Sequence, residues 1–230
     1  MLGTIVNAAA IIAGGVLGSL LRSGLPANIK AIIMQGVSLT VILIGLSMAI
    51  KTENVLVVTL SIVIGGICGE VLKIEDLLDR LGRRLEQRFG GGDGAFTEGF
   101  VTASLVYCVG AMAIMGPLDS GLTGRHTILF VKSILDGVTA VVFASSMGVG
   151  VAFAALPVFL YQGAVTLAAT SVKPLLTDGI IREMTATGGL LIFAIGLNML
   201  TDRLQIKVGN LLPAIFVAIG FTVLFGRLPL

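Results

Sequence analysis

Long apolar stretches separated by short polar segments make up most of this sequence. A helix needs about 20 apolar residues to cross the roughly 30 Å hydrocarbon layer of a bilayer. Eight stretches approach that length: 3–21, 31–50, 54–72, 97–116, 127–147, 149–170, 179–200 and 207–226. The pattern predicts an all-α, polytopic membrane helix bundle of seven or eight transmembrane segments.

Two of these stretches follow one another without a polar loop. Residues 127–147 and 149–170 are separated only by the turn Gly148-Val149-Gly150. Either both cross the membrane as a Gly-broken hairpin, which gives eight spans, or 127–147 is re-entrant, which gives seven. In the stretch 97–116, we expect Pro117 to stop or kink the helix directly after Gly116, because proline lacks a backbone N–H.

The composition excludes a soluble domain. Hydrophobic residues make up 56% of the chain and charged residues 12%, with a mean hydropathy of +1.05, whereas a soluble chain carries roughly 25% charged residues. The net charge of +2 is spread among acids and bases, so no nucleic-acid partner is expected. The 31 glycines suit close helix packing, and Gly14-xxx-Gly18 and Gly65-xxx-Gly69 are typical packing patterns.

The positive charges predict the orientation in the membrane. No basic residue precedes the first apolar run, so residues 1–21 are interpreted as a retained span and not as a signal peptide. With eight spans, nine Lys and Arg residues fall on the side of the 73–96 loop and five on the other. Residues 73–96 are therefore predicted to be cytoplasmic and the N-terminus to lie outside.

The chain is expected to form one integral membrane domain with an amphipathic segment inside it. Residues 73–89 place apolar side chains at helical spacing among charged ones, and glycines follow at 90–94. This helix is predicted to lie on the cytoplasmic membrane surface; the alternative is a surface for partner docking or homo-oligomer formation. The expected parts are a first helix triplet, the amphipathic helix with its Gly-rich linker, central segments and a second helix triplet, at 1–72, 73–96, 97–147 and 149–230.

A short motif occurs twice and predicts an inverted repeat. Residues 44–48 (IGLSM) return at 195–199 as IGLNM, each inside the middle helix of an apolar triplet. The first triplet would then match the last three segments, and an offset of five spans makes the copies inverted, as in many secondary transporters. The alternative is a chance match in a leucine-rich sequence.

A small set of polar residues inside the apolar stretches carries the functional prediction. Lys132 and Asp136 are spaced i,i+4 in one predicted span, where an ionisable group needs a partner or a wet cavity. The substrate or ion pathway is predicted to contain, besides this pair, four further polar side chains: Ser145, Ser146, Gln162 and Asn198. The alternative for the pair is a purely structural ion pair. Polar side chains elsewhere in membrane helices commonly hydrogen-bond one helix to another.

The sequence offers no catalytic, metal or cofactor motif. Cys68 and Cys108 have no paired spacing, and His126 is the single histidine and lacks a partner constellation. We therefore expect no metal, no cofactor and no enzymatic activity.

The residues resemble a family from end to end. Glu98–Met112, Lys132–Gly137, Ala144–Gly150, Tyr161–Gly163 and Gly188–Asn198 are similar to the corresponding stretches of bacterial multi-pass membrane proteins of the YqgA/YdfK type, a domain-of-unknown-function family. The resemblance implies a protein of the bacterial inner membrane. It brings no activity and no functional residue.

Two functions remain open from the sequence. The first is a small secondary transporter or channel for a polar solute or ion, in which Asp136 could carry a coupling proton or cation. The second is a non-transporting membrane scaffold or regulatory subunit that acts through residues 73–89. A polar site in the middle of the membrane would favour the first, and a dry, glycine-packed bundle would favour the second.

Overall fold

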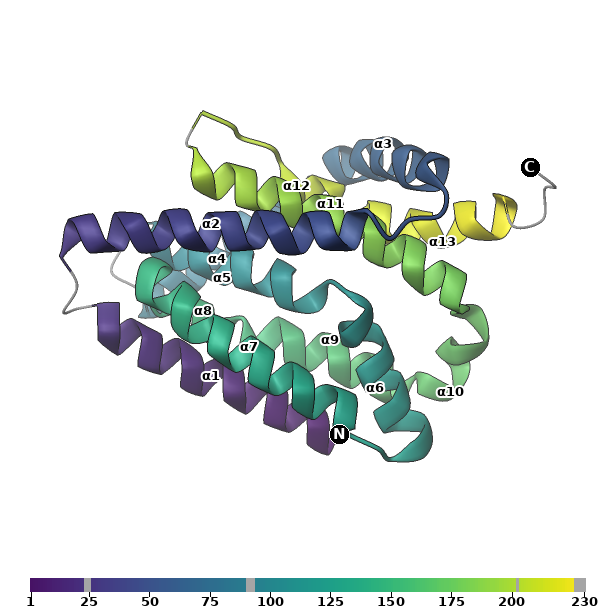
Figure 1. Cartoon of the computed structure of the whole chain (residues 1–230), viewed down its shortest axis with the longest axis horizontal. Coiled ribbons are helices and arrows are strands. Elements are labelled where there is room, and N and C mark those ends of the chain that lie inside the picture. Colours follow the sequence, from purple (N-terminus) through teal and green to yellow (C-terminus); the bar gives the residue numbers. More distant parts are fainter. Residues whose placement is uncertain (23–25, 90–93, 202, 226–230) are drawn as a thin grey trace. The chain divides into compact units, whose positions relative to one another are not determined.

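The computed structural model describes residues 1–22, 26–89, 94–201 and 203–225. Within these ranges the chain is helical and contains no strand (Figure 1). The α-helices are α1 (Leu2–Arg22), α2 (Ala27–Ala49), α3 (Val55–Leu72), α4 (Ile74–Phe89), α5 (Ala95–Cys108), α6 (Ala111–Thr123), α7 (Thr127–Met147), α8 (Gly150–Phe153), α9 (Ala155–Leu167), α10 (Ala169–Val172), α11 (Asp178–Leu200), α12 (Val208–Leu211) and α13 (Pro213–Phe225). A short 3₁₀ turn, η1, covers Lys173–Leu175.

Among the described residues, seven segments are long and apolar enough to cross a membrane, and the number is eight if the bent α5–α6 pair is one span. They include α8–α9 and α12–α13, each counted as a single span. The predicted all-α polytopic bundle is thus confirmed. The α7 segment is an unbroken helix of 21 residues, long enough to cross, and Gly148 with φ of +85° ends it before α8. The Gly-broken hairpin is therefore present.

The break in the fourth apolar stretch is not at Pro117, and that prediction was wrong. Helices α5 and α6 meet near Gly110, whose φ is +117°, with a bend of 60°. Pro117 lies inside α6. Glycine adopts this positive φ without steric cost, whereas proline is tolerated in membrane helices where neighbouring groups satisfy the freed carbonyl.

The contacts divide the described chain into two units. Unit 1 comprises residues 1–37, 79–108 and 112–175, and unit 2 comprises 38–78, 109–111 and 176–230. In unit 1, α1 packs along α7 so closely that a Cβ on Gly14 or Gly18 would overlap the carbonyl oxygens of Gly137 or Val141. The rising residue numbers on both helices show that α1 and α7 run in the same direction.

Helices α5, α6, α8 and α9 also belong to unit 1. Gly15 of α1 lies against Ala152, and a Cβ on Gly163 would lie 3.4 Å from Cε of Met1. These two contacts show that α8–α9 runs antiparallel to α1. Gly121 of α6 meets Thr166 of α9 in the same manner.

Unit 2 is organised around α11, most of which is buried. Gly45 of α2 lies against Phe193, and Gly196 lies against Ile42, so these two helices are antiparallel. On α3, a Cβ on Gly65 would overlap Ala214 and one on Gly69 would overlap Asn210, so α3 runs antiparallel to the α12–α13 segment. The predicted packing role of both Gly-xxx-Gly patterns is thus observed in the contacts.

Candidate functional site

A buried ion pair with an amide partner lies inside unit 1. The Lys132 Nζ is 2.8 Å from Oδ2 of Asp136 and donates to its Oδ1 at 2.9 Å. Nδ2 of Asn7 donates to Oδ2 of the same carboxylate at 3.0 Å. The Lys132 and Asp136 side chains are only 7% and 8% exposed, so this trio is held away from the surface.

Two local features place the trio. Lys132 and Asp136 are one turn apart on α7, as the i,i+4 spacing predicts. Asn7 belongs to α1 and shares a face with Ile11, Gly14 and Gly18, which recur at helical spacing. Because the two glycines bring the α1 and α7 backbones into contact, Asn7 is carried against the α7 carboxylate.

Aromatic and hydroxyl groups of unit 1 flank the trio on the side of α5. Tyr107 is fully buried, and its ring stacks on Phe143 with the centroids 6.1 Å apart. Thr139, one turn after Asp136, places its hydroxyl 3.5 Å from the Tyr107 hydroxyl. The site is therefore built from α1, α5 and α7.

Several buried polar atoms of unit 1 have no hydrogen-bond partner among the described residues. They are Thr4 Oγ1, Asn7 Oδ1, Ser146 Oγ and both amide atoms of Gln162. Thr4, Asn7 and Gln162 are completely buried. Because Met1 meets Gly163, Gln162 lies at the level of the first turns of α1, where Thr4 and Asn7 also lie. Unpaired polar groups in such a place are costly and point to a ligand or ordered water.

The other predicted pathway residues do not form part of the trio. Ser145 and Ser146 lie nine and ten residues beyond Asp136 on α7, about 15 Å further along the helix. The Ser145 hydroxyl donates to the Val142 carbonyl at 2.7 Å. Asn198 belongs to unit 2, where its amide bonds both the N–H and the carbonyl of Ile206 and so closes the turn after α11.

Neither Asn7 nor Thr4 is among the pathway residues predicted from the sequence. The available signal was the register: Asn7, Gly14 and Gly18 share one face of the first helix. A polar residue on a glycine packing face is directed at the partner helix. Which helix that partner is could not be read from the sequence. No group of three or more His, Cys, Asp or Glu side chains suitable for a metal ion occurs among the described residues.

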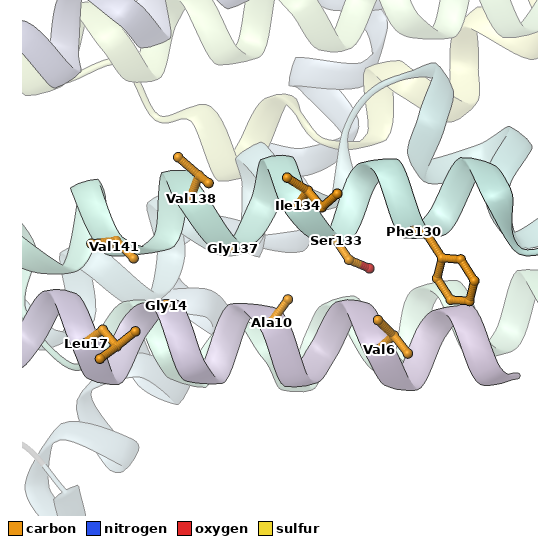
Figure 2. A pocket seen from close by; sticks show the side chains of 10 residues that line it. All are labelled: Val6, Ala10, Gly14, Leu17, Phe130, Ser133, Ile134, Gly137, Val138 and Val141. Carbon is orange, nitrogen blue, oxygen red and sulfur yellow. The ribbon is translucent and has the colours of Figure 1, made fainter.

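An open, apolar groove of about 500 Å³ runs between α1 and α7 (Figure 2). Val6, Leu17, Phe130 and Val138 are among its lining residues, and none of the predicted pathway residues lines it. Its one polar side chain, Ser133, already donates to the Leu129 carbonyl at 2.7 Å. This groove therefore presents hydrocarbon and not a polar binding surface.

Unit 2 holds a second carboxylate–lysine–asparagine trio. Lys207 Nζ lies 3.2 Å from Oε1 of Glu70, and Nδ2 of Asn210 donates to Oε2 at 2.7 Å. Oδ1 of Asn210 also accepts from the N–H of Glu75 at 2.7 Å, which ties the start of α4 to α12. Here the Lys207 and Glu70 side chains are 63% and 61% exposed.

A further carboxylate of unit 2 accepts hydrogen bonds from the loop before α3. Glu183 of α11 is buried and accepts from the Thr52 hydroxyl at 2.5 Å and from the Glu53 N–H at 2.9 Å. Arg182 pairs with Glu53 beside it. These contacts fix the α2–α3 loop on the first turns of α11.

Comparison with known proteins gives matches along the whole chain. A family described as "Protein of unknown function (DUF554)" matches residues 2–223. The membrane protein YdfK of Bacillus subtilis is 31% identical over 221 residues, 94% of this chain and 93% of YdfK. YqgA of Escherichia coli is 30% identical over 223 residues, 95% of this chain and 94% of YqgA. No solved structure matches.

Proposed function

The chain belongs to the DUF554 family, and we propose that it is a small secondary transporter or channel for a polar solute or ion. One observation carries the proposal: the Lys132–Asp136–Asn7 trio is buried in helices long and apolar enough to span a membrane. Ionisable groups at membrane depth are costly, and they commonly mark substrate or ion pathways.

The buried, unpaired polar atoms of unit 1 support a ligand site. Thr4 Oγ1, Asn7 Oδ1 and the Gln162 amide offer acceptors and donors that the protein leaves unused. A solute that supplies the missing hydrogen bonds would offset the cost of burying them. Because Lys132 and Asp136 balance each other, the site is neutral overall and favours a solute that both donates and accepts hydrogen bonds.

Helix pairing supports the inverted repeat that many secondary transporters contain. The predicted copies place α1 with α8–α9, α2 with α11, and α3 with α12–α13. Each of these pairs packs antiparallel within its own unit, as partners related by a two-fold axis in the membrane plane would. Gly45 and Gly196 of the repeated motif both lie in the α2–α11 contact.

Helix directions favour eight spans. If the bent α5–α6 pair were re-entrant, α7 would run opposite to α1, but the two are parallel. The Glu70–Lys207 pair likewise joins the end of α3 to the start of α12, which requires both ends to lie on one side of the membrane. Eight spans satisfy both contacts, and the positive-inside rule then places this side in the cytoplasm of a bacterial cell.

Cysteine labelling tests this topology. In a protein whose Cys68 and Cys108 are replaced by Ala, Gln87→Cys on α4 and Arg125→Cys before α7 provide exposed sites. We expect a membrane-impermeant reagent to label Gln87→Cys from the cytoplasm and Arg125→Cys from outside. Labelling of both from the same face would make the α5–α6 pair re-entrant.

Reconstitution tests the transport proposal. A panel of amino acids, sugars, nucleosides and inorganic ions is screened by thermal shift, since a bound solute stabilises the folded state, and any solute that binds is then assayed for flux into liposomes. We expect Lys132→Met/Asp136→Asn, which removes both charges together, to fold and to lose flux. The matched control Glu70→Gln removes an exposed carboxylate and should keep it. Flux that persists in the folded double variant would remove the trio from the pathway.

Two observations favour the alternative, a non-transporting membrane scaffold. The groove between α1 and α7 is apolar, and the helix contacts at Gly14, Gly18, Gly65 and Gly69 are tight. A scaffold predicts that no solute of the panel shifts the melting temperature. It also predicts that the Lys132→Met/Asp136→Asn variant still inserts into the cell membrane and forms the same complexes as the wild type.

A further inference from the structure

The amphipathic helix α4 has an exposed face on which leucines and arginines stand together. Leu77 and Leu81 are 63% and 46% exposed, and Arg80 and Arg84 are exposed as well. With 3.6 residues per turn, these four side chains fall within an arc of about 100°. Gly82 and Glu86, on the opposite side of the helix, are buried. The helix thus binds the protein with one face and leaves a mixed apolar and basic face open.

Most acidic side chains of α4 are engaged within the protein. Glu86 accepts from the Thr97 hydroxyl at 2.6 Å and from the Gly94 N–H at 2.7 Å. Glu75 accepts from the Gly209 N–H at 2.5 Å, and Asp79 pairs with Arg83 at 3.3 Å. In the described part of the chain no ion pair involves Arg80 or Arg84. Asp76, one turn before Arg80, is exposed as well, so two arginines stand against one exposed carboxylate on this side of the helix.

The covalent connection places the start of α4 at the membrane surface. Helix α3 is long and apolar enough to span and ends at Leu72, and α4 begins at Ile74. The single residue between them, Lys73, has φ of +52° and turns the chain sharply. Helix α4 therefore starts at the level where α3 leaves the hydrocarbon layer, which is the level of the lipid phosphates.

We propose that this face of α4 docks on anionic phospholipid headgroups. Leu77 and Leu81 enter the boundary between headgroups and acyl chains, as the apolar side of an interfacial helix does. Arg80 and Arg84 then reach the phosphates, to which a guanidinium can donate two parallel hydrogen bonds. Charge complementarity selects an anionic over a zwitterionic lipid surface, and this proposal is independent of transport.

Lipid retention tests it on the full-length protein. The protein is reconstituted in phosphatidylcholine containing about 30% phosphatidylglycerol, which supplies the anionic surface. It is then extracted in mild detergent, and the co-purified lipids are quantified by mass spectrometry. The test variant is Arg80→Gln/Arg84→Gln, and the matched control is Arg125→Gln, an exposed arginine paired with Asp119 outside α4. A second variant, Arg80→Lys/Arg84→Lys, keeps the charge.

We expect phosphatidylglycerol to be enriched among the lipids that co-purify with the wild type. In the Gln variant this enrichment should fall by about fivefold for each arginine removed, at low ionic strength. The Arg125→Gln control should equal the wild type, and the Lys variant should retain most of the enrichment. An unchanged enrichment in the folded Gln variant would overturn the proposal. So would displacement of the lipid by inorganic phosphate but not by chloride at equal ionic strength, which would indicate a free-anion site. Loss of a dimer without loss of lipid would instead assign the face to a second copy of the chain.

Discussion

Each unit of this protein holds one carboxylate bonded to one lysine and one asparagine, and the two trios differ in their exposure to solvent. In unit 1, Asp136 with Lys132 and Asn7 is buried among spanning helices. In unit 2, Glu70 with Lys207 is mostly exposed, and only Asn210 is buried. The same three functional groups thus occur in a low-dielectric interior and at a helix end.

The difference in burial assigns a structural role to the unit 2 trio and leaves the unit 1 trio as the candidate site. Asn210 uses its amide to join Glu70 to the Glu75 N–H at the start of α4, so the unit 2 trio ties α3, α4 and α12 together. Asn7 uses only its Nδ2 and leaves Oδ1 unpaired beside the charges. Electrostatic interactions are stronger and unpaired atoms more costly in the buried trio, which makes it the better place for chemistry.

Removal of the lysine should give the largest contrast between the trios. Lys132→Met leaves Asp136 as a buried, unpaired charge, and we expect a loss of about 3–5 kcal/mol in the free energy of unfolding. Lys207→Met leaves the Glu70 carboxylate in contact with solvent, as it already is, and should change the melting temperature little. Chemical denaturation in detergent or bicelles measures both. Equal losses would show that burial does not distinguish the trios, and the double variant Lys132→Met/Asp136→Asn should recover part of the stability.

Removal of the asparagine from the buried trio should have a smaller effect. Asn7→Leu deletes a hydrogen bond to a charged group and should cost about 1.5–3 kcal/mol. The same variant removes the unpaired Oδ1, so it should also weaken any solute that stabilises the wild type. A variant that loses stability but binds the solute as the wild type does would restrict Asn7 to a structural role.

Disturbing the glycine contacts tests what positions each trio. Gly18→Ala on α1 and Gly69→Ala on α3 would place a methyl group on the carbonyl oxygens of Val141 and Asn210, and we expect a loss of about 1–3 kcal/mol for each. Gly220→Ala on α13 is the matched control, because an added Cβ there meets nothing within 4 Å. Alanine favours a helix more than glycine does, so Gly220→Ala should keep or raise the melting temperature. A rise of equal size in all three variants would show that the contacts at Gly18 and Gly69 do not limit packing.

The apolar pattern alone was sufficient for several features of the fold. The lengths of the apolar stretches predicted the spanning helices, because the bilayer thickness fixes how long a span must be. The alternation of charged and apolar residues predicted α4, and the i,i+4 spacing predicted the Lys132–Asp136 pair, since both are local properties of a helix. The break at Gly110 was misplaced to Pro117, because a proline can be accommodated wherever neighbouring helices satisfy the freed carbonyl.

What only the tertiary structure decided is which segments meet. The parallel contact of α1 with α7 joins Asn7 to a carboxylate 129 residues away in the sequence. The contact of α3 with α12 leaves a chemically similar trio exposed. Helix pairing in a membrane depends on the close fit of small residues from distant segments. The hydropathy of one segment does not show which other segment it will contact. The burial that distinguishes Asp136 from Glu70 is therefore a property of the assembled helices and not of either residue's sequence neighbourhood.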